Sequence, residues 1–218
     1  MRSVKVLEML NEGKIDELKT KLQDEIYTDS LKGKPTAKKR YAAMKKYFSY
    51  TNNVRECLQK PCEVEFEDKS YISFTNSWSL ALTTEDTGEI ELFDKDNLKY
   101  PDVTRLISFE GIKRKVDFSK IFAEARSRGY KLTKKEVGPG FEYMMLYDGT
   151  YYKIGLLEAT YGIIDDGKEA MVYHPDGKRK PITIQTSIGI CMIMPVFIDD
   201  DSDDDSDIEP ERVIEVEL

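Results

Sequence analysis

Residues 151–198 decide the fold, and they read YYKIGLLEATYGIIDDGKEAMVYHPDGKRKPITIQTSIGICMIMPVFI. Apolar residues at helical spacing predict a helix from Ile154 to about Ile163. Three runs with strand character follow, separated by turn residues, at 170–174, 181–185 and 190–198. The stretch therefore predicts a short helix followed by three antiparallel strands.

The same pattern occurs once more, nearer the N-terminus. Thr36 is a plausible N-cap for a helix that runs to about Ser49. The period then changes to two, with apolar residues alternating through 62–82 and again through 89–93. We therefore predict an α+β fold built from repeated units, each with one helix and an antiparallel β-meander.

Smaller signals complete the expected layout. Asp148-Gly149 is a hairpin signal that predicts strands on both of its sides. Asp117 is a candidate cap for a helix from Phe118 to about Ser127. We divide the chain into an N-terminal helical segment broken at Gly13, two units and an acidic tail, with bounds 1–35, 36–110, 111–198 and 199–218. The apolar stripe within the first segment is either core or a docking face.

The charge is distributed unevenly along the chain. Residues 199–218 contain eleven acidic residues and one arginine, whereas the whole chain has a formal net charge of -8. The remainder is therefore mildly basic, and we expect the tail to be disordered because its like charges repel. The tail either keeps the protein soluble, or folds back on the basic body as a DNA mimic, or offers its apolar end to a partner.

The composition argues against an enzyme. His174 is the one histidine, which removes the usual general base and histidine-rich metal sites. Cys57, Cys62 and Cys191 form no CxxC pair, so we expect free thiols in a reducing compartment. No cofactor motif is present, and the longest apolar run is too short to cross a membrane. We expect a cytoplasmic protein without cofactor, metal site or catalytic residues.

The helix predicted from Thr36 has one apolar and one basic face. Tyr41, Met44 and Phe48 share the apolar face, and four lysines gather opposite, at Lys38, Lys39, Lys45 and Lys46. A basic helical face is often merely solvated. Alternatively, several lysines on one rigid face can contact a phosphate backbone without reading bases.

Several segments resemble segments of the bacterial DNA polymerase sliding clamps, in the order of that family. Residues 152–159, YKIGLLEA, resemble FNxxYLLDAL, and the strands at 180–184 and 193–196 resemble the PVLI and VMPM strands. Earlier in the chain, 74–82 resemble ATDGHRLAL and 100–107 resemble FPDYRRLIP. The resemblance covers under half of the chain, and its truncated layout with an appended tail suggests a phage or mobile element.

The resemblance implies a ring-forming fold in which helices line a hole for duplex DNA and sheets lie outside. It implies a non-enzymatic replication or repair accessory, or processivity factor, which contacts DNA independently of sequence and is a possible homo-oligomer. The residues expected to face DNA are then Lys38, Lys39, Lys45, Lys46, Lys120, Arg126 and Arg128.

The resemblance also implies an apolar cleft that holds a peptide of a DNA polymerase or repair protein. The matching positions are Thr75, Ser77, Trp78, Ser79, Leu80, Met192, Met194, Pro195 and Val196. Trp78, Met192 and Met194 are equally well read as core residues of alternating strands. The family's His-Arg pair is Trp78-Ser79 here, which indicates a different peptide specificity. The alternative function is a protein-interaction module that acts through its acidic tail without sliding on DNA.

Overall fold

The computed structural model describes residues 3–50, 55–94, 100–132, 143–177, 179–196 and 212–216. The described helices are α1 (Ser3–Asn11), α2 (Ile15–Ser30), α3 (Pro35–Lys46), α4 (Phe118–Ser127) and α5 (Ile154–Ile164). The described strands are β1 (Cys62–Phe66), β2 (Lys69–Thr75), β3 (Ser79–Thr83), β4 (Ile112–Val116), β5 (Met144–Tyr147), β6 (Thr150–Lys153), β7 (Ala170–His174), β8 (Ile182–Gln185), β9 (Gly189–Ile193) and β10 (Val213–Glu215). The expected α+β class is confirmed.

Seven strands form one antiparallel sheet in the order β1-β2-β3-β9-β8-β7-β4. Its centre is the pairing of β3 with β9, in which Leu80 lies opposite Met192 and Leu82 opposite Ile190. Each of these two strands ends one predicted meander, β1-β2-β3 or β7-β8-β9. The helix-plus-meander unit therefore occurs twice, and the two copies share a sheet.

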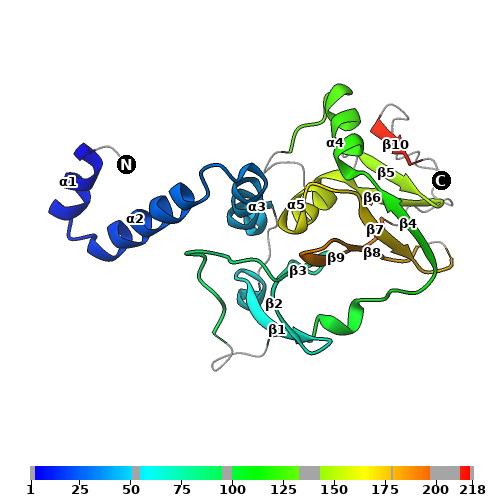
Figure 1. Cartoon of the computed structure of the whole chain (residues 1–218), viewed down its shortest axis with the longest axis horizontal. Coiled ribbons are helices and arrows are strands. Elements are labelled where there is room, and N and C mark those ends of the chain that lie inside the picture. The colour runs from blue at the N-terminus through cyan, green and yellow to red at the C-terminus, as the bar shows by residue number, and fades with distance from the viewer. Residues whose placement is uncertain are drawn as a thin grey trace.

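Both faces of this sheet are covered (Figure 1). Helices α3, α4 and α5 lie over one face, where α3 packs against α5 and α5 packs on β3 and β9. The main core forms there from residues such as Phe74, Ile193 and Leu157. A second cluster around Leu80 and Met192 occupies the opposite face, under the connector at 100–109. The alternation along each central strand fills both clusters.

Two local predictions are confirmed in detail. Asp117 caps α4, and its Oδ1 accepts a hydrogen bond of 3.1 Å from the backbone N of Ser119. Asp148 and Gly149 have φ values of 48° and 70°, the left-handed pair that a tight hairpin between β5 and β6 requires.

The N-terminal segment forms an arm of two helices that projects from the sheet (Figure 1). The predicted break at Gly13 is confirmed, because α1 ends at Asn11 and Gly13 has a φ of 70°. Leu18 is buried, whereas Ile15 and Ile26 are 60% and 70% exposed. The apolar stripe on α2 is therefore only partly used as core.

Two predictions of local structure are wrong, and one strand was not predicted. Residues 89–93 form no strand, because β9 takes the free edge of β3, and Phe93 N donates instead to Pro61 O at 2.7 Å. Thr36 is not an N-cap, since α3 begins with Pro35, whose fixed φ suits the first helical position. The sequence analysis also missed β4, whose alternation is hidden by three consecutive cations.

The tail is not disordered throughout. Residues 197–211, 217 and 218 lie outside the described residues, but Val213–Glu215 form β10, which pairs in parallel with β5. Ile214 is 1% exposed and belongs to the main core. The prediction of disorder over all of 199–218 is therefore wrong at 212–216, where Ile214 is buried in the core. No described helix has the length and apolarity that a membrane span needs.

Candidate functional site

The turn between β2 and β3 presents Trp78. Asn76 Oδ1 accepts hydrogen bonds from Trp78 N at 3.0 Å, Ser79 N at 2.9 Å and Ser79 Oγ at 3.1 Å. Ser77, between them, has a φ of 75°, so the chain reverses sharply. Asparagine closes such turns by bonding the backbone two residues later. As a result Trp78 is 61% exposed although Asn76 and Ser79, on either side of the turn, are buried.

Met194 lies beside this turn. Its backbone N donates a hydrogen bond of 2.9 Å to Trp78 O, directly beyond the pair Ser79 and Ile193 at the end of the β3–β9 ladder. Met194 is half-buried and packs against the cluster that contains Leu80 and Met192. An exposed indole and a flexible thioether therefore border one apolar surface, which we call the Trp78–Met194 surface.

A buried polar network holds the turn from below. Ser79 Oγ lies 2.9 Å from Tyr47 Oη and accepts a hydrogen bond of 2.9 Å from Thr160 Oγ1. Thr75 Oγ1 donates to Ser79 O at 2.9 Å. Burial raises the pKa of Tyr47, so its phenol stays protonated and able to donate. Strand β3, which begins at Ser79 directly after Trp78, is therefore fixed to both α5 and the residue that follows α3.

The nine residues predicted for the cleft differ in their exposure to solvent. Ser77 and Trp78 are exposed and Met194 and Val196 are half-buried, whereas the other five are buried: Thr75, Ser79, Leu80, Met192 and Pro195. Leu80 and Met192 are core residues, and Ser79 belongs to the polar network. Trp78 is not a core residue. The side chains that a partner could reach are thus Ser77, Trp78, Met194 and Val196.

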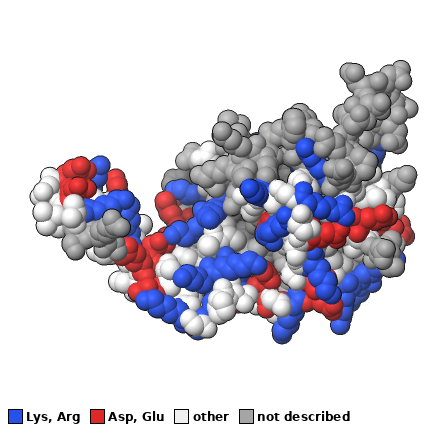
Figure 2. Space-filling model, turned by 90° about the horizontal axis from the view of Figure 1, so that it is seen from above, with Lys and Arg blue, Asp and Glu red and all other residues white. Residues whose placement is uncertain are grey.

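The predicted DNA-facing cations lie on α3 and α4, and all are exposed. Five of the seven form ion pairs with nearby acids: Lys39 with Asp165 at 3.3 Å, Lys45 with Asp24 at 2.6 Å, Lys120 with Asp117 at 3.3 Å, Arg126 with Glu158, and Arg128 with Glu124. Lys38 makes no ion pair with an acid in the described part of the chain, and Lys46 is exposed. Figure 2 shows Lys and Arg interspersed with Asp and Glu over the face in view.

The pair of Lys45 and Asp24 also has a structural role, since it joins α3 to the arm. Asp24 accepts hydrogen bonds from Lys45 Nζ and from Tyr41 Oη, each at 2.6 Å. Partial burial opposes ionisation of Asp24, but these two donors outweigh burial and lower the pKa of its carboxyl. Lys45 therefore already forms an ion pair that attaches the arm to α3.

The sequence analysis missed three residues of this site. Asn76 had a readable signal, because an asparagine two residues before Trp78 in a polar turn predicts this type of capping. Tyr47 and Thr160 gave no signal, since both lie in apolar helical patterns and meet Ser79 only through the tertiary fold. Among the described residues, no three His, Cys, Asp or Glu side chains are placed to hold a metal ion.

Two of the solved structures that are similar to this chain come from bacteria. One is the DNA polymerase III beta subunit of Thermotoga maritima, with a TM-score of 0.49 and 11% identity, over 81% of this chain and 66% of that one. The other is the DNA polymerase sliding clamp of Bacillus subtilis, with a TM-score of 0.44 and 15% identity, over 75% of this chain and 63% of that one. No family profile matches this sequence, and no curated protein does. The chain spans slightly less than two thirds of each of the two proteins, and at these scores neither likeness assigns it to a family.

Proposed function

We propose that this protein is a non-enzymatic, clamp-like accessory of DNA replication or repair. In this proposal, cations of α3 and α4 contact the phosphates of duplex DNA without reading the sequence. The Trp78–Met194 surface binds a peptide of a partner such as a polymerase or a repair protein. Binding DNA and a partner at separate surfaces would keep the partner on its template.

The observation that carries the proposal is the contact of Trp78 with Met194. The two segments that resemble the clamp's cleft motifs lie far apart in the sequence, and the 2.9 Å bond from Met194 N to Trp78 O brings them together. Tryptophan is the residue type most enriched in binding hot spots, and methionine adapts its shape to different peptides. An indole with 61% exposure at this junction is well suited to anchor a peptide.

The ion pairs on α3 and α4 do not prevent contact with DNA. Exposed pairs of this kind contribute only about 0 to 1 kcal/mol each, so a phosphate can replace the carboxylate partner at small cost. They do lower the net charge that the helices present, which predicts weak and strongly salt-dependent binding.

Fluorescence anisotropy with a labelled DNA duplex tests the first half of the proposal, over a salt series from about 50 to 300 mM. Reversal of Lys38, Lys39, Lys45 and Lys46 to Glu should abolish binding, whereas Trp78→Ala should leave it unchanged. Absence of binding by the natural protein at the lowest salt would remove the DNA half. Native mass spectrometry on the same samples reports whether several copies assemble around the duplex.

The second half concerns the partner surface and can be tested with the sole tryptophan of the chain. A partner peptide that covers Trp78 should shift its emission to shorter wavelength and protect it from acrylamide. A Met194→Lys variant should lose that response and keep DNA binding, because Met194 lies on no basic helix. An emission unchanged by polymerase-derived peptides at millimolar concentration would count against the surface.

An interaction module that acts through its acidic tail is the second candidate function. It is favoured by β10, because residues 213–215 of the tail form a strand and bury an isoleucine when a sheet edge is available. Pull-downs with the full chain and with a chain that lacks residues 208–218 separate the two candidates. Loss of all partners on truncation, with DNA binding absent, would favour the tail.

A further inference from the structure

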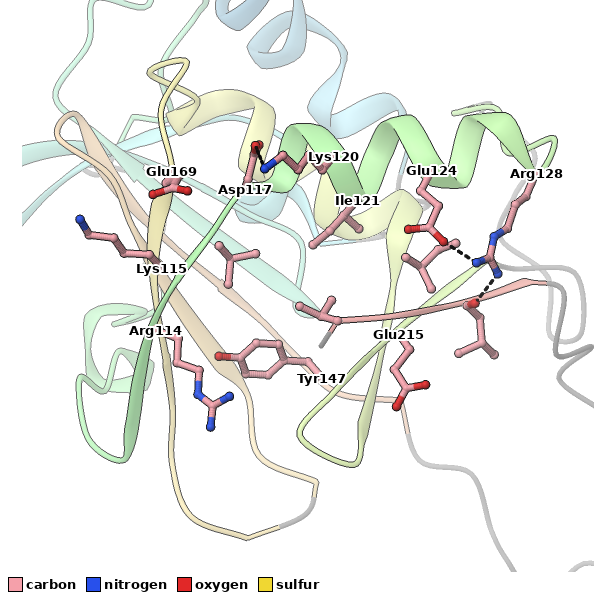
Figure 3. A pocket seen from close by; sticks show the side chains of 14 residues that line it. Arg114, Lys115, Asp117, Lys120, Ile121, Glu124, Arg128, Tyr147, Glu169 and Glu215 are labelled. Atoms are coloured by element: carbon pink, nitrogen blue, oxygen red, sulfur yellow. Dashed lines mark hydrogen bonds and ion pairs between the residues drawn. The ribbon is translucent and has the colours of Figure 1, made fainter. Parts of the chain in front are cut away.

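A pocket of about 810 Å³ lies between β4 and β10, below α4 (Figure 3). It lies apart from the Trp78–Met194 surface, which is at the central β3–β9 pair of the large sheet. One wall of the pocket is β4, at the edge of that sheet, and the other is β10 of the three-stranded sheet. The predicted cations Lys120 and Arg128 are at its rim, but both are paired with acids of α4 or its cap.

Both walls of the pocket are edge strands. β4 pairs with β7 on one side and ends the large sheet, and β10 pairs with β5 and ends the small one. Within the described chain, no other strand pairs with the free side of either. An edge strand presents a row of backbone donors and acceptors that can pair with another extended segment.

The β4 wall is cationic. Its sequence is Ile112-Lys113-Arg114-Lys115-Val116, and Lys113 and Lys115 are exposed while Arg114 is half-buried. Lys113 Nζ lies 5.2 Å from the centre of the Tyr173 ring, on the face of the sheet away from the helices. Neither Arg114 nor Lys115 forms an ion pair with an acid in the described ranges. Four acids also line the pocket: Asp117 and Glu124, which pair with Lys120 and Arg128, then Glu169 next to β7, and Glu215 on β10.

The buried residues that line the pocket are apolar, apart from one unsatisfied hydroxyl. Val116, Ile121 and Ile214 are buried, and they line it together with Tyr147. Tyr147 is 1% exposed, and its hydroxyl has no hydrogen-bond partner in the structure. Figure 3 shows this ring lying across the space between the two strands, with Arg114 beside it. Side chains that point inward from an added strand would therefore meet apolar groups and one free polar group.

The chain itself indicates which peptide such an edge accepts. Residues 214–217, Ile-Glu-Val-Glu, alternate apolar and acidic side chains, and Val213, Ile214 and Glu215 already pair with β5 next to this pocket. Ile214 fills the core, and Arg128 Nη1 donates a hydrogen bond of 2.8 Å to Val213 O. An alternating acidic segment thus finds both apolar contacts and a cation here.

We propose that the pocket between β4 and β10 binds an extended peptide of alternating apolar and acidic residues, which adds to β4 as an antiparallel or parallel strand. Backbone bonds to β4 supply the affinity, inward apolar side chains lie on Val116 and Ile121, and outward carboxylates lie beside Lys113 and Lys115. The partner is another protein's acidic segment, and the site is separate from the Trp78–Met194 surface but shares Lys120 and Arg128 with the proposed DNA contacts.

The probe is a synthetic eight-residue Val-Glu repeat, with a Val-Lys repeat of equal length as its charge control. Amide hydrogen exchange of the full protein should slow at residues 112–116 with the Val-Glu repeat and not with the Val-Lys repeat. In Lys113→Glu/Lys115→Glu, the affinity for the Val-Glu repeat should fall by at least about tenfold and the Val-Lys repeat should bind instead. The matched control is Lys5→Glu/Lys69→Glu, which changes the net charge equally at two exposed lysines outside the pocket.

Three results would overturn the proposal. The first is equal protection by both peptides, which would indicate nonspecific strand addition. The second is protection confined to residues 144–147, which would mean that the peptide replaces β10 on β5. The third is no protection of 112–116 at millimolar peptide, in which case the lysines of β4 only guard the edge against self-association.

Discussion

Thr160 Oγ1 donates a hydrogen bond of 2.9 Å to Ser79 Oγ, and this contact joins helix α5 to the first residue of β3. Tyr47 Oη meets the same serine oxygen at 2.9 Å, from the residue that follows α3. The two central helices are thus tied to the strand that carries Trp78 at its start. The orientation of the indole depends on a buried polar cluster, not on the indole's own packing.

Two tyrosine-to-phenylalanine substitutions should have opposite effects. Tyr47→Phe removes the buried hydrogen bond between Tyr47 Oη and Ser79 Oγ, so it should lower the free energy of unfolding by about 0.5 to 1.5 kcal/mol. Tyr147→Phe removes a buried hydroxyl that has no partner, so the protein should keep its stability or gain up to about 1 kcal/mol. Urea denaturation of the two variants measures the difference. Equal destabilisation would show that Tyr147 has a partner in solution, such as a buried water.

The turn before β3 should respond differently at its two polar positions. Asn76→Ala removes the acceptor of three hydrogen bonds, so Trp78 should become more mobile, with lower fluorescence anisotropy and a lower melting temperature. Ser77→Gly should be neutral or stabilising, because Ser77 has a φ of 75° that glycine adopts without strain. An Asn76→Ala variant with unaltered Trp78 anisotropy would contradict the assigned role of this residue.

Asp166 should contribute to stability in a pH-dependent way. Its partial burial opposes ionisation, but Ser187 N and Oγ donate to Oδ2 at 3.1 and 2.7 Å and lower the pKa of the carboxyl. Because the folded-state pKa is below the unfolded value of about 3.9, the contribution is complete above that value and is lost as the pH falls through the folded-state pKa. Asp166→Asn should therefore lower stability near neutral pH and have a smaller effect at about pH 3. The comparison of urea midpoints at the two pH values checks this, with Asp16→Asn on the exposed first turn of α2 as the control.

The three cysteines should differ in reactivity. Cys62 and Cys191 are fully buried, and burial raises the pKa of the Cys191 thiol, whereas Cys57 is half-buried. Titration with a thiol reagent should modify Cys57 in the native protein, and all three only after denaturation. Rapid native labelling of Cys191 would mean that β9 opens from the sheet centre on the time scale of the reaction.

Local patterns were sufficient to predict much of the fold. The Asp117 cap, the Asp148-Gly149 hairpin and the helix from Ile154 depend on neighbours in sequence, and all three are confirmed. The pairing of β3 with β9 could not be predicted, because it joins residues more than 100 positions apart and no local pattern selects the partner of an edge. For the same reason, residues 89–93 were predicted to be a strand of the first meander, although β9 occupies the edge of β3.

The candidate site was predictable in part. Trp78 and Met194 could be named from the family resemblance. The exposure of Trp78 depends on the Asn76 turn, and the burial of Met192 depends on tertiary packing, so neither could be read from the sequence. The basic residues of α3 and α4 were identified from the sequence, whereas their acidic partners Asp165, Asp24 and Glu158 come from other elements. Charge along the sequence therefore overestimated the positive potential of these helices.

The two ends of the β3–β9 pair have the same backbone hydrogen bond but different side chains. At one end Met194 N bonds to Trp78 O, and at the other Thr84 N bonds to Ile188 O at 3.1 Å. The two bonds are equivalent under a local twofold rotation that exchanges the strands, so Ile188 is the counterpart of Trp78 and Thr84 the counterpart of Met194. The same backbone hydrogen bond therefore occurs at both ends of the β3–β9 pair, whereas the large aromatic Trp78 and the thioether of Met194 are at one end only. The Ile188→Trp/Thr84→Met variant would place the same two residue types at the rotated end, so a peptide that binds the Trp78–Met194 surface under the proposed function should then bind at two sites on one sheet.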